Sequence, residues 1–339
     1  MPASNNNIIT LAHGGGGVKT GNLIKDIIAP HLKNAILDQM DDAAVLNLPS
    51  TRIAFSTDSY VVTPLIFPGG DIGKLAACGT INDLVMQGAK PLYLSLGLIL
   101  EEGLEIAVLE QIIISLAAVV QSCNVQVVTG DTKVVERGKG NGIFINTTGI
   151  GVLMPDVNVH AGNARPGDVV IVSGTIGDHG IAVLSKRAEL GFTTELKSDT
   201  AALWPMIQPL LAAIPQIRSL RDPTRGGVAA ALCDIAAASK TGIRIFEKQL
   251  PVKPAVRGAC SLMGFDPLNI ANEGKAIIIC PPECAAQALS IIRNHPLGEN
   301  GCIIGEVIAE PAGLVLLKTA MGGQRIVEIP SGEDLPRIC

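Results

Sequence analysis

Aromatic and charged side chains are scarce in this chain of 339 residues: they make up 3% and 17% of it, and the net charge is −5. No block of lysine and arginine stands out, so the sequence does not favour nucleic acid as a partner. No apolar run reaches the roughly 18 residues of a membrane-spanning helix, and the N-terminus lacks the basic start of a leader peptide. These absences predict a soluble, cytoplasmic protein with no membrane contact.

The common nucleotide-binding loops are also absent. Lys19 and Thr20 follow a valine rather than the glycine of a GxxxxGK[ST] loop. The stretch SGTIGDHG at 173–180 lacks the GxGxxG spacing of dinucleotide-binding folds. A nucleotide, if one binds, must therefore be held by another architecture.

What the chain has is a large aliphatic fraction. Apolar residues make up 47% of it, and its 37 glycines and 21 prolines are spread along its length, which indicates two ordinary domains with many turns. Most of the eight cysteines lie in apolar runs, so we expect buried, reduced thiols. Cys280 and Cys284 form a CxxxC pair, but no second pair stands at zinc spacing and their role stays open.

Hydrophobic periodicity predicts alternating strands and helices, a mixed α/β pattern. The polar stretch 155–166 interrupts it, so we divide the chain into domains 1–154 and 155–320 and a tail, 321–339. The first half is expected to hold strands at 52–59, 91–100, 125–132 and 142–153 and helices at 73–87 and 104–123. The second half is expected to hold strands at 169–174, 275–280 and 302–308 and helices at 180–190, after Arg225 and at 283–294.

Aspartates recur where the predicted strands end or meet helices: Asp42, Asp58, Asp83 and Asp131. One aspartate in such a place is usually a turn or cap residue. Several in one half of the chain, each beside a small or glycine-rich turn, indicate convergence on one site. Carboxylate oxygens suit Mg²⁺, which takes one or two of them and completes its shell with water and phosphate. We therefore expect magnesium together with a nucleotide.

Two glycine-containing segments are candidates for binding the phosphates. HGGGG includes Gly15 and Gly16 and precedes Lys19, and its backbone amides can wrap around an anion, although such a string is more often a flexible loop. DPTRGG opens a helix of small residues, so its amides and Arg225 can meet a phosphate at the positive end of that helix.

The chain given ends on a cysteine, Cys339, in the segment PSGEDLPRIC. Ten extended residues reach roughly 33–36 Å, enough to enter an active site and to present the sulfur to a second protein. The alternative is an exposed cysteine without a role. Prolines stiffen this segment, and its glycine and acidic residues keep it solvated, which favours a thiol that carries a group.

Eight strings together resemble the carbamoyl dehydratases of hydrogenase maturation, the HypE family: HGGGG, DDAAVL, FSTDSYVVTPLIFPGGDIGKLAACGTINDLVMQGAKP, GDTKVV, SGTIGDHG, DPTRGGVA, ANEGK and the final PRIC. The resemblance runs in order from about Asn7 to Cys339 and extends to the superfamily of aminoimidazole ribonucleotide synthetase and selenophosphate synthetase. It implies a two-domain, PurM-like mixed α/β fold. The N-terminal domain would bind ATP and form a homodimer through its mixed sheet, and an α/β domain and a flexible tail would follow.

The resemblance also implies a reaction. A carbamoyltransferase, HypF, places a carbamoyl group on the terminal sulfur, ATP phosphorylates the amide oxygen, and loss of a proton and of phosphate leaves a thiocyanate. The cyano group then passes to iron on a HypC–HypD complex. The resemblance assigns catalysis to Cys339, Glu273 and Lys133, nucleotide binding to Gly15, Gly16, Lys19, Asp42, Asp58, Asp83, Asp131, Thr132 and Arg225, and Mg²⁺ binding to Asp42, Asp58, Asp83 and Asp131.

Two other functions stay open at this point. A small-molecule synthetase or kinase of the same superfamily would leave Cys339 without a role. It would also lack the cysteine that selenophosphate synthetases typically carry between the positions of His13 and Lys19. A non-catalytic thiol carrier would use the tail but not the aspartates. Glu273, in turn, has the alternative role of a salt-bridge partner.

Overall fold

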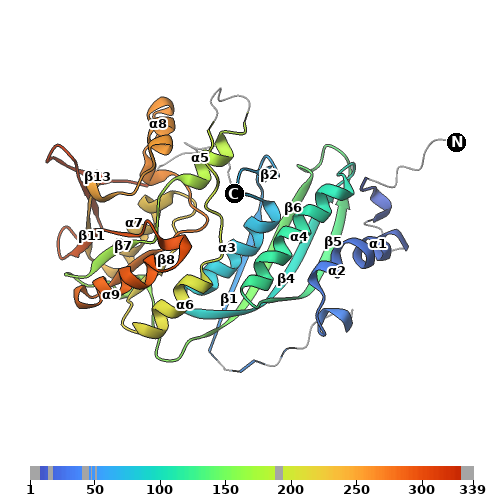
Figure 1. Cartoon of the computed structure of the whole chain (residues 1–339), viewed down its shortest axis with the longest axis horizontal. Helices are drawn as coiled ribbons and strands as arrows, with labels where there is room; N and C mark the ends of the chain where they lie inside the picture. The colour runs from blue at the N-terminus through green and yellow to red at the C-terminus, as the bar shows by residue number, and fades with distance from the viewer. Residues whose placement is uncertain are drawn as a thin grey trace.

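The computed structural model describes residues 8–13, 18–39, 46, 48–49, 52–187 and 194–329. Two sheets organise them, one of four strands in the N-terminal half and one of seven in the C-terminal half, and they lie side by side along the molecule (Figure 1). A two-stranded ribbon, β2 (Ile66–Phe67) with β3 (Gly70–Asp71), accompanies them. Within the described ranges, no helix is both long and apolar enough to span a bilayer.

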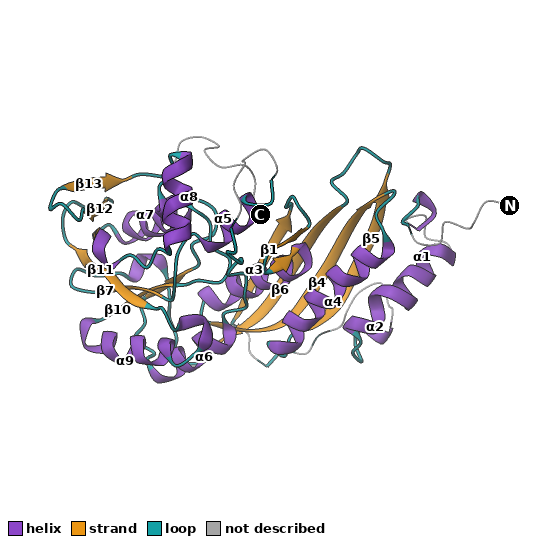
Figure 2. Cartoon of the chain, turned by 45° about the horizontal axis from the view of Figure 1, so that its top comes forward, coloured by secondary structure: helices purple, strands orange, loops and turns teal. Residues whose placement is uncertain are grey.

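The N-terminal sheet has the strand order β1-β6-β4-β5. Strand β6 is antiparallel to both β1 and β4, whereas β4 and β5 are parallel because α4 crosses over between them. Helices α3 and α4 cover one face of the sheet (Figure 2). The bounds are α1 (Val18–Leu23), α2 (Ala29–Leu32), β1 (Ile53–Tyr60), α3 (Ile72–Met86), β4 (Ala89–Glu101), α4 (Ile106–Ser122), β5 (Gln126–Val135) and β6 (Ile143–Leu153).

The other face of this sheet carries exposed apolar side chains. Phe55 is 67% exposed, and Ile53 and Ile99 are 44% and 43% exposed. Their neighbours along the strands, such as Ala54 and Leu98, are buried on the helix-covered side. We name this side the open face, defined by Ile53, Phe55 and Ile99 and the residues in register on the same side. Large apolar side chains exposed along one face of a sheet are typical of an interaction surface.

Helix α3 is buried along most of its length and carries Asp83 near its end. Asp71 caps its N-terminus by accepting a hydrogen bond of 2.9 Å from the backbone N–H of Gly73. The hydroxyl of Ser115, on α4, donates to the same carboxylate and ties the two helices together. A side chain at Gly73 would collide with the carbonyl oxygen of Ile112 on α4. Close helix packing therefore fixes the position of α3.

The C-terminal sheet has the order β13-β12-β9-β11-β7-β10-β8 and is antiparallel except where β12 pairs with β9. Helix α7 packs on the core of one face, and α6 and α9 pack together on the other. The bounds are β7 (Val169–Val172), α5 (Asp178–Leu184), α6 (Trp204–Ala213), β8 (Ser219–Arg221), α7 (Gly227–Ser239), β9 (Gly242–Phe246), α8 (Pro254–Met263), β10 (Ile277–Cys280), α9 (Pro282–Arg293), β11 (Cys302–Ile308), β12 (Val315–Lys318) and β13 (Gln324–Val327).

Most of the predicted elements are confirmed. The structure has the strands and helices expected in the first half, β1, β4, β5, β6, α3 and α4. In the second half it has the expected elements β7, α7, β10, α9 and β11. The helix expected at 180–190 is wrong at its end, because α5 stops at Leu184 and the next two residues form a turn. Helix α6 was not predicted; it contains Pro209, a residue uncommon inside helices. The other helices and strands missed were α1, α2, α8, β2, β3, β8, β9, β12 and β13.

The cysteines in the described part of the chain are free thiols. Cys280 ends β10 and is buried, whereas Cys284 is partly exposed in the first turn of α9. Burial raises the pKa of the Cys280 thiol to about 12, so it stays protonated and unreactive at neutral pH.

Replacement of Gly73 by alanine tests the close contact of α3 with α4. The new methyl group would meet the Ile112 carbonyl, so we expect a destabilisation of roughly 1–3 kcal/mol. Gly21, in α1, has nothing within 4 Å of a Cβ, and Gly21→Ala should be neutral or stabilising by up to about 1 kcal/mol. Thermal unfolding of both variants measures the difference. Equal unfolding midpoints for the two variants would mean that α3 can move away from α4 without loss of stability.

Candidate active site

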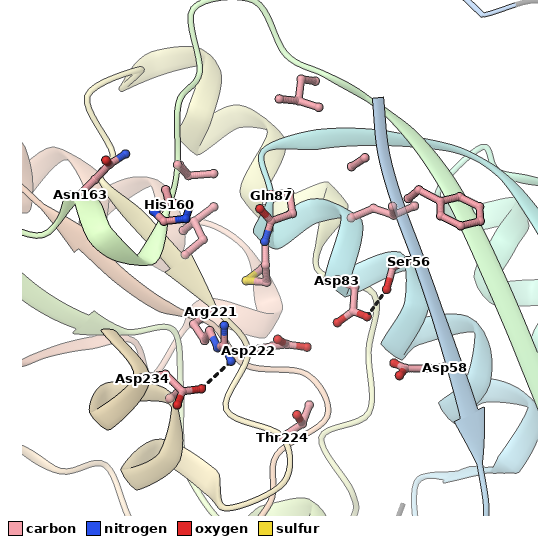
Figure 3. A pocket seen from close by; sticks show the side chains of 18 of the residues that line it. Ser56, Asp58, Asp83, Gln87, His160, Asn163, Arg221, Asp222, Thr224 and Asp234 are labelled. Atoms are coloured by element: carbon pink, nitrogen blue, oxygen red, sulfur yellow. Dashed lines mark hydrogen bonds and ion pairs between the residues drawn. The ribbon is translucent and has the colours of Figure 1, made fainter. Parts of the chain in front are cut away.

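A cleft of about 830 Å³ lies between the two domains (Figure 3). Strand β1 and the C-terminal end of α3 form one side of it. Residues 158–163 and the segment from β8 into α7 form the other. Because both domains supply its walls, the cleft exists only in their packed arrangement.

Four carboxylates converge at one end of this cleft. Asp58 lies on β1, Asp83 on α3, Asp222 directly after β8, and Glu273 in the segment before β10. All four line a small chamber of about 40 Å³ that adjoins the cleft. One water needs roughly 10–15 Å³ on this scale, so the chamber has room for a group of a few heavy atoms.

Burial and repulsion between neighbouring charges raise the pKa values of three of these carboxylates, Asp83, Asp222 and Glu273. Burial is the main cause that raises the pKa of Asp83 to about 7, and the nearby charge of Asp222 adds to it. Burial likewise raises the pKa of Asp222 to about 6. The pKa of Glu273 lies well above its ordinary value, first through burial and then through the charge of Asp222. A cation in this place would relieve the repulsion and would therefore be bound.

Hydroxyl groups orient two of these carboxylates. Ser56 Oγ donates a hydrogen bond of 2.6 Å to Asp83 Oδ2, and Tyr60 Oη donates one of 3.3 Å to Asp58 Oδ2. Burial, followed by the charge of Asp58, raises the pKa of Tyr60 well above its ordinary value. The phenol therefore keeps its proton and remains a hydrogen-bond donor to the site.

The cationic part of the chamber comes from the loop that opens α7. Thr224 and Arg225 line both the cleft and the chamber, and Gly227, the first residue of α7, lines the cleft. Gly226 and Gly227 have φ angles of 75° and 61°, which glycine adopts without strain. This turn brings the N-terminus of a helix of 13 residues to the cleft, an arrangement that binds phosphate.

The structure thus brings together four of the residues predicted from the sequence: Asp58, Asp83, Arg225 and Glu273. With Asp222 we name them the cleft group. Sequence reasoning missed Asp222 as a carboxylate, although it begins the DPTRGG motif that was noted for its arginine. It also missed Ser56 and Tyr60, which alternate with Asp58 along β1 and so share its face.

A second set of predicted residues lies elsewhere in the same chain. Asp131, Thr132 and Lys133 are on β5, at the opposite edge of the sheet from β1. Lys133 Nζ lies 2.6 Å from Asp131 Oδ1, and both side chains are largely exposed. Lys19, on α1, is exposed as well, and none of these four lines the cleft. We name them the edge group.

The strand register shows that Asp58 and Asp131 also face opposite sides of the sheet. Asp58 pairs with Thr147, which is buried and donates a hydrogen bond to α3. Asp131 is in register, through β4, with Asn146, the neighbour of Thr147 and therefore on the open face. Within a single chain, Asp131 therefore lies at the other edge and on the other side of the sheet from Asp58, and whether it shares a metal site with Asp58 and Asp83 stays a prediction. Lys133 is likewise remote from Glu273.

Four predicted residues lie outside the part of the chain that the structure describes: Gly15, Gly16, Asp42 and Cys339. The structure therefore says nothing of the HGGGG loop, of the first aspartate or of the terminal thiol.

The cleft group fits Mg²⁺ by the type of its donors. Within the described ranges, no three histidine, cysteine or acidic side chains are arranged as a ready metal cage. Magnesium needs fewer, because it takes one or two carboxylates and completes its shell with water and phosphate. Asp58, Asp83 and Asp222 are such oxygen donors, and a bound cation would offset the burial and repulsion that raise the pKa values of Asp83 and Asp222.

Comparison with known proteins identifies the family. Residues 40–153 match the model of the AIR synthase related protein, N-terminal domain, and residues 165–318 match that of its C-terminal domain. Carbamoyl dehydratase HypE of Azotobacter vinelandii is 50% identical over 98% of both chains. Carbamoyl dehydratase HypE of Escherichia coli (strain K12) is 47% identical over 98% of this chain and 100% of its own.

Solved structures agree with this assignment. Hydrogenase maturation protein HypE in complex with ATP superposes with a TM-score of 0.93 at 45% identity, over 97% of this chain and 99% of that chain. A HypE–HypF complex gives a TM-score of 0.80 at 48% identity, over 91% of this chain and 99% of that chain. The two-domain mixed α/β fold expected from the sequence is confirmed, and the chain belongs to the HypE carbamoyl dehydratases of the AIR synthase related family.

Proposed function

We propose that this chain uses ATP to dehydrate a carbamoyl group carried on Cys339 to a cyano group. The observation that carries the proposal is the convergence of four carboxylates and Arg225 on one small chamber at the N-terminus of α7. The relatives' name, carbamoyl dehydratase, and the ATP bound in the solved HypE structure support the same chemistry.

Each member of the cleft group has a role in this reaction. Asp58, Asp83 and Asp222 would hold Mg²⁺, which neutralises phosphate charge when bound. The N-terminus of α7 and Arg225 would bind the phosphates. The carbamoyl oxygen attacks the γ-phosphoryl group and ADP leaves. The C–O bond then breaks with loss of phosphate, both protons leave the nitrogen, and S–C≡N remains.

Glu273 is the proposed base for a nitrogen proton. Its side chain is 4% exposed and lines the chamber. Once a bound cation offsets the repulsion that favours its protonated form, the ionised Glu273 is a stronger proton acceptor than an ordinary carboxylate, which suits removal of a proton in a dry site. Lys133, the other candidate, does not reach this chamber within one chain.

The length of the tail allows Cys339 to reach its own cleft. Val327, at the end of β13, accepts a hydrogen bond of 3.5 Å at its carbonyl oxygen from Cys233 Sγ on α7. Cys233 lies six residues after Gly227, or about 9 Å along the helix from the cleft. Twelve residues follow Val327 and span up to about 40 Å, so the sulfur can enter the chamber with chain to spare.

A homodimer would account for the edge group. The edge group and the cleft group lie at opposite edges of one sheet, whose open face exposes Ile53, Phe55 and Ile99. A two-fold axis through such a face makes an isologous contact, in which each chain can bring its β5 edge to the partner's cleft. Asp131 and Lys133 would then join the cleft group of the second copy, and each dimer would hold two composite sites.

The proposed partners follow from the chemistry of the tail. A carbamoyl donor must load Cys339, and the solved HypE–HypF complex supports a HypF carbamoyltransferase for this chain. An iron-carrying acceptor must then take the cyano group, for which we propose a HypC–HypD complex. We place these exchanges in the cytoplasm, where the [NiFe]-hydrogenase iron would receive its cyanide.

Asp83→Asn should change ligand binding and stability in opposite directions. Without this carboxylate, the affinity for magnesium and ATP should fall about tenfold or more, as measured by calorimetry. The ligand-free variant should unfold at a higher temperature than the wild type near pH 8, and this difference should shrink as the pH falls toward 4. The reason is that a carboxylate with a folded pKa of about 7, against an ordinary 3.8, loses stability as pH rises between those values.

Asp156→Asn is the matched control for this variant. Asp156 is exposed in a turn with a φ angle of 61°, which asparagine tolerates. This variant should bind and unfold like the wild type. If Asp83→Asn also bound magnesium and ATP like the wild type, the metal site would have to lie elsewhere.

Variants of the tail and of Glu273 should block different steps. Cys339→Ala should bind ATP but form no product, as should a chain that lacks residues 336–339. Glu273→Gln should accept the carbamoyl group and then stall, so intact-mass analysis should find Cys339 heavier than the cyano product by one water. Conversion of Glu273→Gln at the wild-type rate would make Glu273 structural and Lys133 the leading base. A wild type that never loses water with ATP would favour a non-catalytic carrier.

Mixed dimers test the composite site. Glu273→Gln and Lys133→Ala should each be inactive alone, but a heterodimer of the two retains one site with both residues intact. Random mixing should restore about a quarter of wild-type activity. Mixing Glu273→Gln with Asp58→Asn should restore none, because both belong to the cleft group. No restoration in the first mixture, with dimers present by light scattering, would refute the composite site.

A further inference from the structure

A short segment makes hydrogen bonds to both domains. We name residues 198–203, from Ser198 to Leu203, the bridging segment; α6 begins directly after it. Toward the N-terminal domain, the backbone N–H of Ser198 donates a hydrogen bond of 2.7 Å to the carbonyl oxygen of Pro68. Toward the C-terminal domain, the hydroxyls of Ser198 and Thr200 lie 2.8 and 3.3 Å from Nδ1 of the buried His179.

Asn82 binds this segment with both ends of its side-chain amide. Its Nδ2 donates to the carbonyl oxygen of Ala201 at 3.0 Å, and its Oδ1 accepts from the backbone N–H of Leu203 at 2.8 Å. Asn82 is 1% exposed, so no water competes for these bonds. It directly precedes Asp83 on α3, and its backbone therefore moves with that carboxylate.

The same segment holds Glu273 from the other side. The backbone N–H of Ala201 donates to the carbonyl oxygen of Glu273 at 3.3 Å, and the backbone N–H of Glu273 donates to Asp199 Oδ1 at 3.1 Å. A side chain at Gly274 would collide with the carbonyl oxygen of Asp199, so only glycine allows this approach. Asp199 Oδ2 also lies 3.2 Å from Nζ of the buried Lys275.

We propose that the bridging segment sets the position of Glu273 relative to Asp83, and that Asn82 and Asp199 are the positioning residues through which it does so. The inference rests on the proposed function, in which Asp83 binds the nucleotide's metal and Glu273 takes the nitrogen proton. The two groups come from different domains, and an error of about 1 Å between such groups can slow a reaction about 100-fold. A continuous series of hydrogen bonds, from Asn82 through the bridging segment to Glu273, restricts the movement of Glu273 relative to Asp83.

Two variants of Asp199 separate the hydrogen bond from the charge. Asp199→Ala and Asp199→Asn both remove the negative charge beside Lys275, but only the asparagine keeps an oxygen that accepts from the Glu273 N–H. With Cys339 preloaded by HypF and a carbamoyl donor, and with saturating magnesium and ATP, the rate of water loss from Cys339 is followed by intact mass. Asp199→Ala should be roughly 10- to 100-fold slower than the wild type, and Asp199→Asn should recover most of that loss.

Asn82→Ala tests the other end of the chain of bonds. It should slow water loss to a similar extent while its affinity for magnesium and ATP stays at the wild-type value, because the carboxylates themselves are unchanged. Lys197→Ala is the control beside the bridging segment, since this side chain is exposed, and its rate should not change. If Asn82→Ala does not fold, the comparison of Asp199→Ala with Asp199→Asn tests the inference by itself.

The outcomes distinguish the inference from the proposed function. If the wild type loses water but Asn82→Ala and Asp199→Ala do so equally fast, the bridging segment only joins the domains and the inference is wrong. If Asp199→Asn is as slow as Asp199→Ala, the charge and not the hydrogen bond matters, which also overturns it. If the wild type loses no water, the proposed function fails and the inference fails with it.

Discussion

Burial of like charges against one another is the constraint on which the rest of this structure depends. Asp83, Asp222 and Glu273 are removed from water at one point, where burial and mutual repulsion raise their pKa values. If one chain segment carried all three carboxylates, each side chain would turn toward water and the three would not stay buried together. Here each comes from a separate rigid element, and α3, buried along most of its length, holds Asp83 in place. The stability of two large apolar cores offsets the cost of the cluster.

The same constraint explains why the cleft lies between domains. A carboxylate cluster inside one core would be inaccessible to a nucleotide. On a surface, water would screen the repulsion between the carboxylates. Between the domains, β1 and α3 supply one half of the carboxylates, and the segments next to β8 and β10 supply the other half. The hydrogen bonds of Asn82 to the bridging segment join these halves across the boundary. Precise packing of the two domains is thus a requirement of the site.

The sequence predicted the elements of this fold better than their arrangement. Periodicity located most of the strands and helices, because apolar spacing follows local geometry. It could not show the order β1-β6-β4-β5, in which strands distant in the sequence are neighbours. Asp83 and Asp131 illustrate the consequence: both follow apolar stretches beside small residues, yet only Asp83 reaches the cleft. The difference lies in strand order and register, which depend on contacts between distant parts of the chain.

A tethered substrate changes what such a site has to do. An enzyme that binds a free substrate must open, capture it and close, and the energy of binding must order both partners. Under the proposed function the substrate is this chain's own tail, about twelve residues beyond Val327, so its effective concentration at the cleft is on the order of millimolar without any binding contact. The cleft can then stay fixed, with Glu273 and Asp83 joined through buried hydrogen bonds, while the motion of the reaction cycle is left to the tail. Under this proposal, the bridging segment keeps Glu273 and Asp83 in fixed positions, and the terminal cysteine brings the substrate to them.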